Sequence, residues 1–223
     1  MLKTLPASEV TLRFLKQSLN LQAASSTQFF SEWQIESNAW SEVERTYLDR
    51  VQANFLDLLE DPPILENSVK MVVLAPLLDL AGFYRRPFRI TTETSMEIEL
   101  ENEGICIQGR IDVLVVSSSL WLVVIESKRS DFSVTRALPQ ALAYMLGNPH
   151  SISRERTSRC TYGLITNGAE FMFLKTQQQA REAASISQYA TSRLFSLFNP
   201  GNELAQVLTI LKHLANLSIE QEV

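Results

Sequence analysis

The sequence has few of the residues that build nitrogen- and sulfur-ligated metal sites. Its 223 residues include two cysteines, Cys106 and Cys160, and two histidines, His150 and His213. The cysteines show neither metal-ligand spacing nor the pattern of a disulfide framework, and the histidines match no motif such as HExxH. We therefore expect buried reduced thiols, and the sequence argues against a histidine-based zinc site.

Long hydrophobic runs are also missing. The longest apolar stretch covers residues 71–83, is interrupted by Asp79, and is too short to cross a bilayer. The first ten residues, MLKTLPASEV, lack the apolar segment that a secretory signal needs. We expect a cytoplasmic protein that does not enter a membrane.

An excess of positive charge is absent as well. The net charge is −5 and the calculated pI is about 5.2. This balance excludes a surface coated with basic residues for nonspecific binding of nucleic acid. It leaves room for a local basic groove beside acidic metal ligands, because such ligands count as negative until the metal binds.

The hydrophobic periodicity predicts helices in the first third of the chain. Residues 7–24 carry apolar residues near helical spacing, and Ser41 with Glu44 forms a capping-box pattern that opens a helix over 41–60. A third helix is expected over 64–82, kinked at Pro76 and ended by Gly82.

The period then changes to that of strands. Strands are expected over 96–100, 105–116 and 121–128, and the nearly continuous Val, Ile and Leu of the last two indicates a sheet covered on both faces. A crossover helix beginning near 133 or 138 and ending at Gly147 follows, then a hairpin over 162–175 and a closing helix over 202–217. The sequence thus predicts an α/β fold, with a mixed sheet made of an antiparallel meander, a crossover helix and a hairpin, flanked by helices.

Three segments are expected within one compact domain. Residues 1–60 form an N-terminal helical segment packed on the core, residues 61–176 form the core, and residues 177–223 form a C-terminal segment that ends in a helix.

Acidic and basic side chains interrupt the two buried strands. If residues 118–120 form a three-residue loop, Asp112 lies directly opposite Glu126 and Arg110 lies opposite Lys128. Two carboxylates this close repel each other, and a Mg²⁺ ion would resolve the conflict. Lys128 would orient or activate a metal-bound water. A loop of different length would move Asp112 to the other face of the sheet.

These segments, GRIDVLVV, LWLVVIESKR and PQALAYM, resemble the PD-(D/E)xK nuclease superfamily. More narrowly, they are similar to the N-terminal nuclease domain of type I restriction enzyme R subunits and their stand-alone relatives. That group has a glutamate on a helix before the sheet, matched here by Glu66, and a Gln-x-x-x-Tyr motif, matched by Gln140 and Tyr144. The sequence departs from the superfamily motif at Ile111, where its name has Pro. It also has no Gly-Lys pair, so the P-loop of a translocation motor is absent.

The resemblance implies a restriction-endonuclease-like fold and hydrolysis of DNA with Mg²⁺, or with Mn²⁺ as a substitute. Asp112, Glu126 and the Ser127 carbonyl would bind the metal, and Glu66 would support them. Lys128 would serve the attacking water, and Gln140 would orient Lys128 or the phosphate. The candidate phosphate contacts are Arg110, Arg129 and Arg136. A homodimer and separate methylase or motor subunits are possible partners.

Plainer interpretations stand beside these. Glu126 and Lys128 could form a surface ion pair, Glu66 could only favour its helix dipole, and Tyr144 could only pack in the core. Two other functions remain open: a non-catalytic module that binds nucleic acid or a partner, and a structural interaction protein. In the structural protein, Asp112 and Glu126 would be paired with cations of the protein itself.

Overall fold

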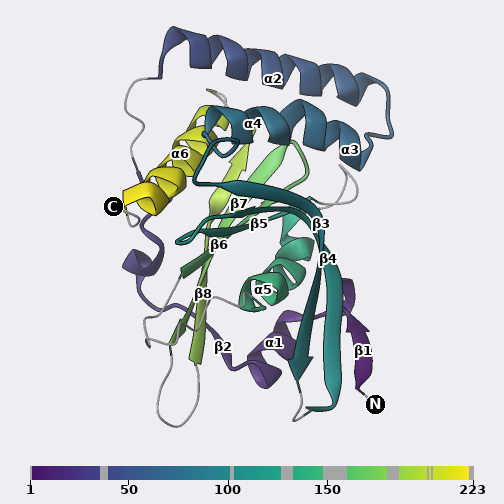
Figure 1. Cartoon of the computed structure of the whole chain (residues 1–223). Coiled ribbons are helices and arrows are strands. Elements are labelled where there is room, and N and C mark those ends of the chain that lie inside the picture. The colour runs from purple at the N-terminus through teal and green to yellow at the C-terminus, as the bar shows by residue number, and fades with distance from the viewer. Residues whose placement is uncertain are drawn as a thin grey trace.

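The computed structural model describes residues 2–35, 40–100, 103–126, 133–147, 160–179, 186–199, 201 and 203–220. The side chains of Val123, Ile125, Glu126 and Gln179 also fall outside the description. The described residues form a mixed α/β structure with one eight-stranded sheet flanked by helices (Figure 1). The predicted α/β class and the mixed, helix-flanked sheet are therefore confirmed.

The sheet has the strand order β1-β4-β5-β6-β7-β8-β2, and β3 pairs with β4 beside this path. Its strands are β1 (Lys3–Pro6), β2 (Leu21–Ala23), β3 (Arg89–Leu100), β4 (Ile105–Val116), β5 (Trp121–Glu126), β6 (Cys160–Thr166), β7 (Glu170–Gln179) and β8 (Ile186–Ser196). The β1–β4, β2–β8 and β5–β6 pairs are parallel, and the others are antiparallel.

Helices cover both faces of the sheet. One core contains residues of α2 (Glu42–Glu60), α3 (Glu66–Val69), α4 (Ala75–Leu80) and α6 (Leu204–Glu220). The other contains residues of α1 (Leu12–Ser18) and α5 (Leu138–Leu146). Figure 1 shows α2 running alongside α3 and α4 above the sheet. Apolar residues on both faces explain the continuous hydrophobic pattern of β4.

The first third of the chain is less helical than its periodicity predicts. Only Leu12–Ser18 of the expected 7–24 helix is α-helical, and β1 and β2 join the sheet at opposite ends of the strand order. The helix begins late because the Thr11 hydroxyl caps it by accepting from the Phe14 N–H. It is followed by Asn20, whose φ of 47° lies in the left-handed region. Residues 1–60 therefore contain the strands β1 and β2 as well as the helices α1 and α2.

The capping box at Ser41 is confirmed. The Ser41 hydroxyl accepts from the Glu44 N–H at 3.2 Å, and the Glu44 carboxylate accepts from the Ser41 N–H at 3.0 Å. The helix expected over 64–82 is divided into α3, a π-helical segment η3 (Lys70–Leu74) and α4. The π-helical segment lies directly before the proline turn of α4, where Pro76 lacks the N–H that a regular helix needs.

The register of the β4–β5 hairpin differs from the prediction by one residue. Val116 lies opposite Trp121 and Val113 lies opposite Val124, because the Ser117 N–H donates to the Leu120 carbonyl and closes a shorter turn. The Ser117 hydroxyl tightens this turn by accepting from the N–H groups of Ser119 and Leu120. The expected alignment of Asp112 with Glu126 is therefore wrong, and that of Arg110 with Lys128 lies outside the described residues. Because the β4–β5 ladder ends at Val113, the shift does not decide the face of Asp112, whose carboxylate lies 3.7 Å from the ammonium of Lys70.

The second predicted hairpin is confirmed. Gly168 has a φ of 89°, and the Asn167 side-chain oxygen accepts from the N–H groups of Ala169 and Glu170. β8 was not expected from the sequence, and it extends the sheet beyond residue 176.

Candidate functional site

β4 carries a gap in the pairing along one of its edges. β3 pairs with the other edge along nearly the whole strand. On this edge β1 pairs with Ile105 to Gln108, and β5 pairs with Val113 to Val116. Among the described strands, none pairs with this edge at residues 109–112. The gap contains Arg110 and Asp112, so two of the predicted site residues lie where β1 and β5 diverge.

The hydroxyl of Tyr144 enters this gap from α5. It accepts a hydrogen bond from the Arg110 N–H at 2.9 Å and another from the Gln140 amide at 3.1 Å. Gly109 leaves the necessary room, because a Cβ there would lie 2.1 Å from the Tyr144 hydroxyl oxygen. Tyr144 is 2% exposed and packs in the core. The side chain therefore fills the core and also satisfies the backbone of β4 beside Asp112.

The ionisation of Tyr144 is affected by this position. Burial raises the pKa of Tyr144, and the negative charge of Asp112 raises it further, against the hydrogen bonds from Gln140 and Arg110. The phenol therefore stays protonated at neutral pH. Gln140 contacts Tyr144, so it reaches the β4 backbone through this hydroxyl.

Lys70 gathers carboxylates from three separate elements. Its ammonium nitrogen lies 3.3 Å from a carboxylate oxygen of Glu66 on α3, 3.4 Å from one of Glu93 on β3, and 3.7 Å from one of Asp112 on β4. The side chains of Lys70 and Asp112 are 17% and 15% exposed. The structure thus brings the predicted residues Glu66 and Asp112 together, around a lysine that the sequence analysis did not single out.

Glu93 is the second residue that the sequence analysis missed. Its φ of 53° lies in the left-handed region, which is rare for a residue other than glycine. The β3–β4 ladder pairs Thr92 with Val113 and Thr94 with Ile111 but omits the position between them. Burial alone would raise the pKa of Glu93, but hydrogen bonds from Lys70 and Arg110 outweigh it and lower that pKa.

Two of the predicted phosphate contacts are exposed arginines. Arg110 is 65% exposed, and its guanidinium lies 3.4 Å from the Glu93 carboxylate. Arg136 is an exposed residue of the 3₁₀ turn η5 (Val134–Ala137), which leads directly into α5. Both side chains are exposed, and their contact with phosphate stays a prediction.

The remaining predicted site residues fall largely outside the described part of the chain. Ser127, Lys128 and Arg129 lie there, and so does the side chain of Glu126, whose backbone pairs with Thr166. Thr166 leads into the turn at Gly168, where a Cβ would contact Val69, the residue before Lys70. Glu126, the last residue of β5, therefore pairs beside the Thr166–Gly168 turn, and that turn packs against the residue before Lys70. We use the name Lys70 cluster for Lys70, Glu66, Glu93 and Asp112.

The cluster has the donor chemistry of a hard divalent cation. Mg²⁺ is usually held by one or two carboxylates together with water, and the carboxylates of Asp112 and Glu66 supply this kind of ligand. Within the described part of the chain, no group of three or more His, Cys, Asp or Glu side chains is arranged to hold a metal ion. The ammonium of Lys70 lies among these carboxylates and neutralises part of their charge.

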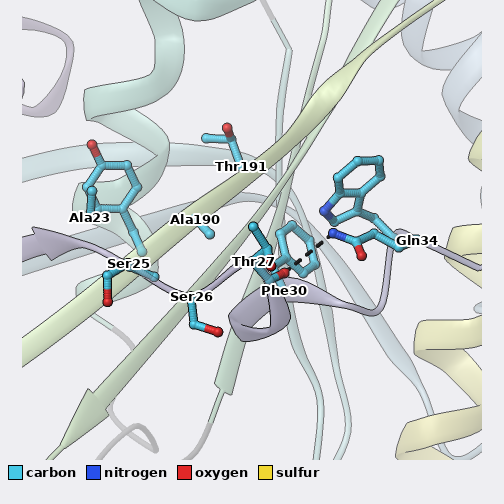
Figure 2. A pocket seen from close by; sticks show the side chains of 11 residues that line it. Ala23, Ser25, Ser26, Thr27, Phe30, Gln34, Ala190 and Thr191 are labelled. Carbon is cyan, nitrogen blue, oxygen red and sulfur yellow. Dashed lines mark hydrogen bonds between the residues drawn. The ribbon is translucent and has the colours of Figure 1, made fainter.

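A pocket of about 400 Å³ lies near the opposite edge of the sheet (Figure 2). It is formed by the segment after β2, the 3₁₀ turn η2 (Thr27–Phe30) and the middle of β8, and it includes Trp33 and Tyr189. The Gln34 amide donates to the Thr27 carbonyl at 3.4 Å, as Figure 2 shows. No charged side chain is among its described lining residues, so this pocket does not have the character of a phosphate site.

No protein-family model matches the chain, and no curated protein matches its sequence. None of the described helices has the length and apolar character needed to cross a membrane.

Proposed function

We propose that this chain is a metal-dependent nuclease of restriction-endonuclease-like fold that hydrolyses phosphodiester bonds of DNA. One observation carries the proposal: Glu66, Glu93 and Asp112, from three different elements, converge within 4 Å of Lys70 beside the unpaired edge of β4. Carboxylates that converge in this way repel each other, and such an arrangement is common where a cation or a reaction uses them. The adjacent strand β5 leads directly into Ser127 and Lys128.

Asp112, Glu126 and the Ser127 carbonyl would hold Mg²⁺ or Mn²⁺, with Glu66 in support. The bound ion would supply Lewis acidity and lower the pKa of a water molecule. Lys128 would orient the attacking water. Gln140 and Tyr144 position the β4 backbone through the Arg110 N–H, so they keep Asp112 at the unpaired edge.

DNA would approach from the exposed side of the cluster. Arg110, which contacts Glu93 of the cluster, and Arg136 on η5 are exposed, and with Arg129 they would contact the phosphates. One site cuts one strand, so cleavage of duplex DNA requires a homodimer or two successive nicks.

The test is cleavage of supercoiled and linear DNA with Mg²⁺ or Mn²⁺ by the wild type and by Lys128→Ala. We expect metal-dependent nicking by the wild type and a loss of at least about 100-fold in Lys128→Ala, because that variant keeps the carboxylates and removes the group assigned to the water. Glu99→Gln, at an exposed position on β3, is the matched control and should cleave like the wild type. Equal activity in Lys128→Ala and the wild type would contradict the proposal.

A second candidate is a non-catalytic module that binds nucleic acid. The ion pair between Lys70 and Asp112 favours a function without a metal, because a protein cation already neutralises part of the acidic cluster. The same pairing is expected of a structural interaction protein, which differs in that it would not bind DNA. This candidate predicts DNA binding without cleavage, in which Arg110→Ala weakens binding and Asp112→Asn does not. Band-shift titrations at two salt concentrations, with cleavage followed in the same samples, distinguish the two functions.

A further inference from the structure

The outer edge of β8 continues beyond the short strand that pairs with it. β2 pairs only with Ser187 to Tyr189, and the ladder ends where the Ala24 N–H donates to the Tyr189 carbonyl at 2.8 Å. β8 itself extends to Ser196. Among the described strands, none pairs with this edge after Tyr189. The second half of β8 therefore presents a strand edge that another extended chain could join.

Thr191 is the first residue whose main chain faces this part of the edge. The Ser187 N–H donates to the Asn20 carbonyl, and the Tyr189 carbonyl accepts from Ala24, so both residues point their main chain toward β2. Alternate residues of a strand direct their N–H and C=O groups to the same side. Thr191, two residues after Tyr189, therefore offers one donor and one acceptor to an added strand.

The pocket of about 400 Å³ lies directly beside Thr191 (Figure 2). Ala190 and Thr191 line it from β8, and Phe30, Trp33 and Gln34 line it from the segment that follows β2. Phe30 is buried, Trp33 and Thr191 are half-buried, and Gln34 is exposed, so the pocket reaches from the core to solvent. Its described lining side chains are uncharged, which suits an uncharged side chain better than a carboxylate or an ammonium.

The nearest charged residue of β8 is turned back onto the protein. The Arg193 guanidinium donates to Glu203 at 2.6 Å and to Gln206 at 2.5 Å. It also lies 4.1 Å from the ring centroid of Phe195. These contacts hold the charge of Arg193, so the edge at Ala190 and Thr191 stays neutral.

The outer edge of β3 gives a contrast within the same sheet. None of the described strands pairs with it either. That strand carries the exposed charges of Arg89, Glu97 and Glu99, and the left-handed φ of Glu93 interrupts its ladder. Charges and irregular backbone are common devices that keep an edge strand from pairing. The β8 edge has a neutral pocket in their place.

We propose that the β8 edge at Thr191 binds an extended peptide segment of a partner protein, which adds a short strand beyond the end of β2 and places one uncharged aromatic or aliphatic side chain in the pocket. Main-chain hydrogen bonds to Thr191 hold the peptide, and the pocket selects its side chain. This inference is independent of the proposed nuclease function, because β8 lies four strands from β4 in the sheet.

The test adds blocked pentapeptides to the ¹⁵N-labelled full chain. Their sequence is Thr-Thr-X-Thr-Thr, in which X is Phe, Tyr, Leu or Asp. At millimolar concentration the peptides with Phe, Tyr or Leu should shift the amide signals of Ala190 and Thr191 and the indole N–H signal of Trp33, and the Asp peptide should not. Unshifted signals at these residues with all four peptides, or equal shifts with the Asp peptide, would overturn the inference.

Variants of β8 separate the main-chain contact from the pocket. Thr191→Pro removes the N–H at the open edge, a position where strands tolerate proline, and should weaken binding of the best peptide at least about tenfold. Thr191→Val keeps the N–H and is the matched control, which should bind within about twofold of the wild type. Ala190→Leu fills the pocket and should also weaken binding. Thermal unfolding shows that each variant is folded, and undiminished binding by both Thr191→Pro and Ala190→Leu would contradict the proposal.

A second copy of this chain is the other occupant that a strand edge could accept. Sedimentation of the wild type and of Thr191→Pro over a range of concentrations distinguishes it from a partner peptide. A wild type that dimerises while Thr191→Pro stays monomeric would assign the edge to self-association and overturn the proposal. The same association state in both proteins, together with the peptide-induced shifts at Thr191, supports it.

Discussion

Two lysines of this protein lie among acidic side chains, and they illustrate two different uses of a partly buried charge. Lys70 lies within 4 Å of the carboxylates of Glu66, Glu93 and Asp112, beside the unpaired edge of β4. Lys175 on β7 forms an ion pair of 2.5 Å with Glu32. Within the described part of the chain, negative charge is in excess around the first lysine and balanced around the second.

The surroundings of Lys175 are those of an internal structural pair. The Tyr162 hydroxyl donates to the same Glu32 oxygen at 2.8 Å, and the ammonium lies 5.3 Å from the ring centroid of Phe29 and 5.9 Å from that of Tyr162. Burial raises the pKa of Tyr162, and the neighbouring Cys160 and Glu32 raise it further, so the phenol remains a donor. A lysine among carboxylates is therefore not enough to indicate a site. The candidate site differs from the structural pair by its excess of carboxylates over cations and by the exposure of those carboxylates to solvent.

The largest expected difference is in DNA cleavage, between variants of the Lys70 cluster and variants of the Lys175 cluster, which consists of Lys175, Glu32 and Tyr162. If the chain has the proposed function, Asp112→Asn should lower the rate of DNA cleavage with Mg²⁺ about a thousandfold, or about 4 kcal/mol, because the proposed metal site loses a carboxylate. Tyr162→Phe, which alters only the Lys175 cluster, should leave the rate unchanged. Single-turnover cleavage of a plasmid measures the rates of both variants. Equal rates in Asp112→Asn and the wild type would show that the Lys70 cluster is not a catalytic site.

The next effect is on stability. Lys175→Met should lower the free energy of unfolding by about 3 kcal/mol, because Glu32 would remain buried without its cation. Urea denaturation at pH 7 measures this loss. Lys70→Met should cost less, because two of its three carboxylate partners, Glu66 and Glu93, are 29% and 51% exposed and water can solvate them. Only Asp112, at 15%, is about as buried as Glu32, at 13%. Equal losses in the two variants would contradict the distinction.

Much of the fold follows from local signals in the sequence. β4, the turn at Asn167 and Gly168 and the capping box at Ser41 were all predictable, because each depends on neighbouring residues. The short strands β1 and β2 and the polar strand β8 were not, because their pairing partners are distant in sequence.

The candidate site could be predicted only in part. Glu66 and Asp112 both lie within 4 Å of the Lys70 ammonium, and Gln140 lies in contact with Tyr144. The hairpin register could not be predicted, because its turn is held by a hydrogen bond from Ser119 to the Ser218 carbonyl in α6. Lys70 and Glu93 were missed because one begins a π-helical segment and the other adopts a left-handed φ. The four-residue spacing between Glu66 and Lys70 could have predicted their ion pair, because residues four apart lie on the same face of a helix.

A smaller effect is expected from the backbone of the Lys70 cluster. Glu93→Gly should be more stable than Glu93→Gln by about 1 kcal/mol, because glycine adopts a φ of 53° without strain and both variants lose the carboxylate. Thermal unfolding of the pair measures the difference. A glycine variant less stable than the glutamine variant would show that Glu93 is not strained.

The smallest effect on stability is expected for the ion pair between Lys212 and Glu44. This pair is partly exposed, so its contribution serves as a reference for the other two lysines. The hydrogen bond from Lys212, followed by that from the Ser41 N–H, lowers the pKa of Glu44 below its ordinary value of 4.5. Glu44 therefore stabilises the fold above pH 4.5, and this contribution is lost as the pH falls through the lowered pKa.

The variant Glu44→Gln should be less stable than the wild type by about 1 kcal/mol at pH 7, as for other capping residues. The difference should shrink as the pH falls below 4.5. Urea denaturation across this range measures it, and a difference that does not depend on pH would contradict the assignment.

The most direct test of the functional assignment is to locate Mn²⁺ on the protein by the broadening of amide signals in ¹H–¹⁵N spectra. At substoichiometric Mn²⁺ the amides of Arg110 and Asp112 should lose intensity first, and those of Cys160 and Lys175 should keep it. β4 and β7 are three strands apart in the sheet, about 14 Å, so the two clusters are resolved. Broadening that begins at Lys175, or uniform loss of intensity along the chain, would contradict the assignment of the Lys70 cluster as the metal site.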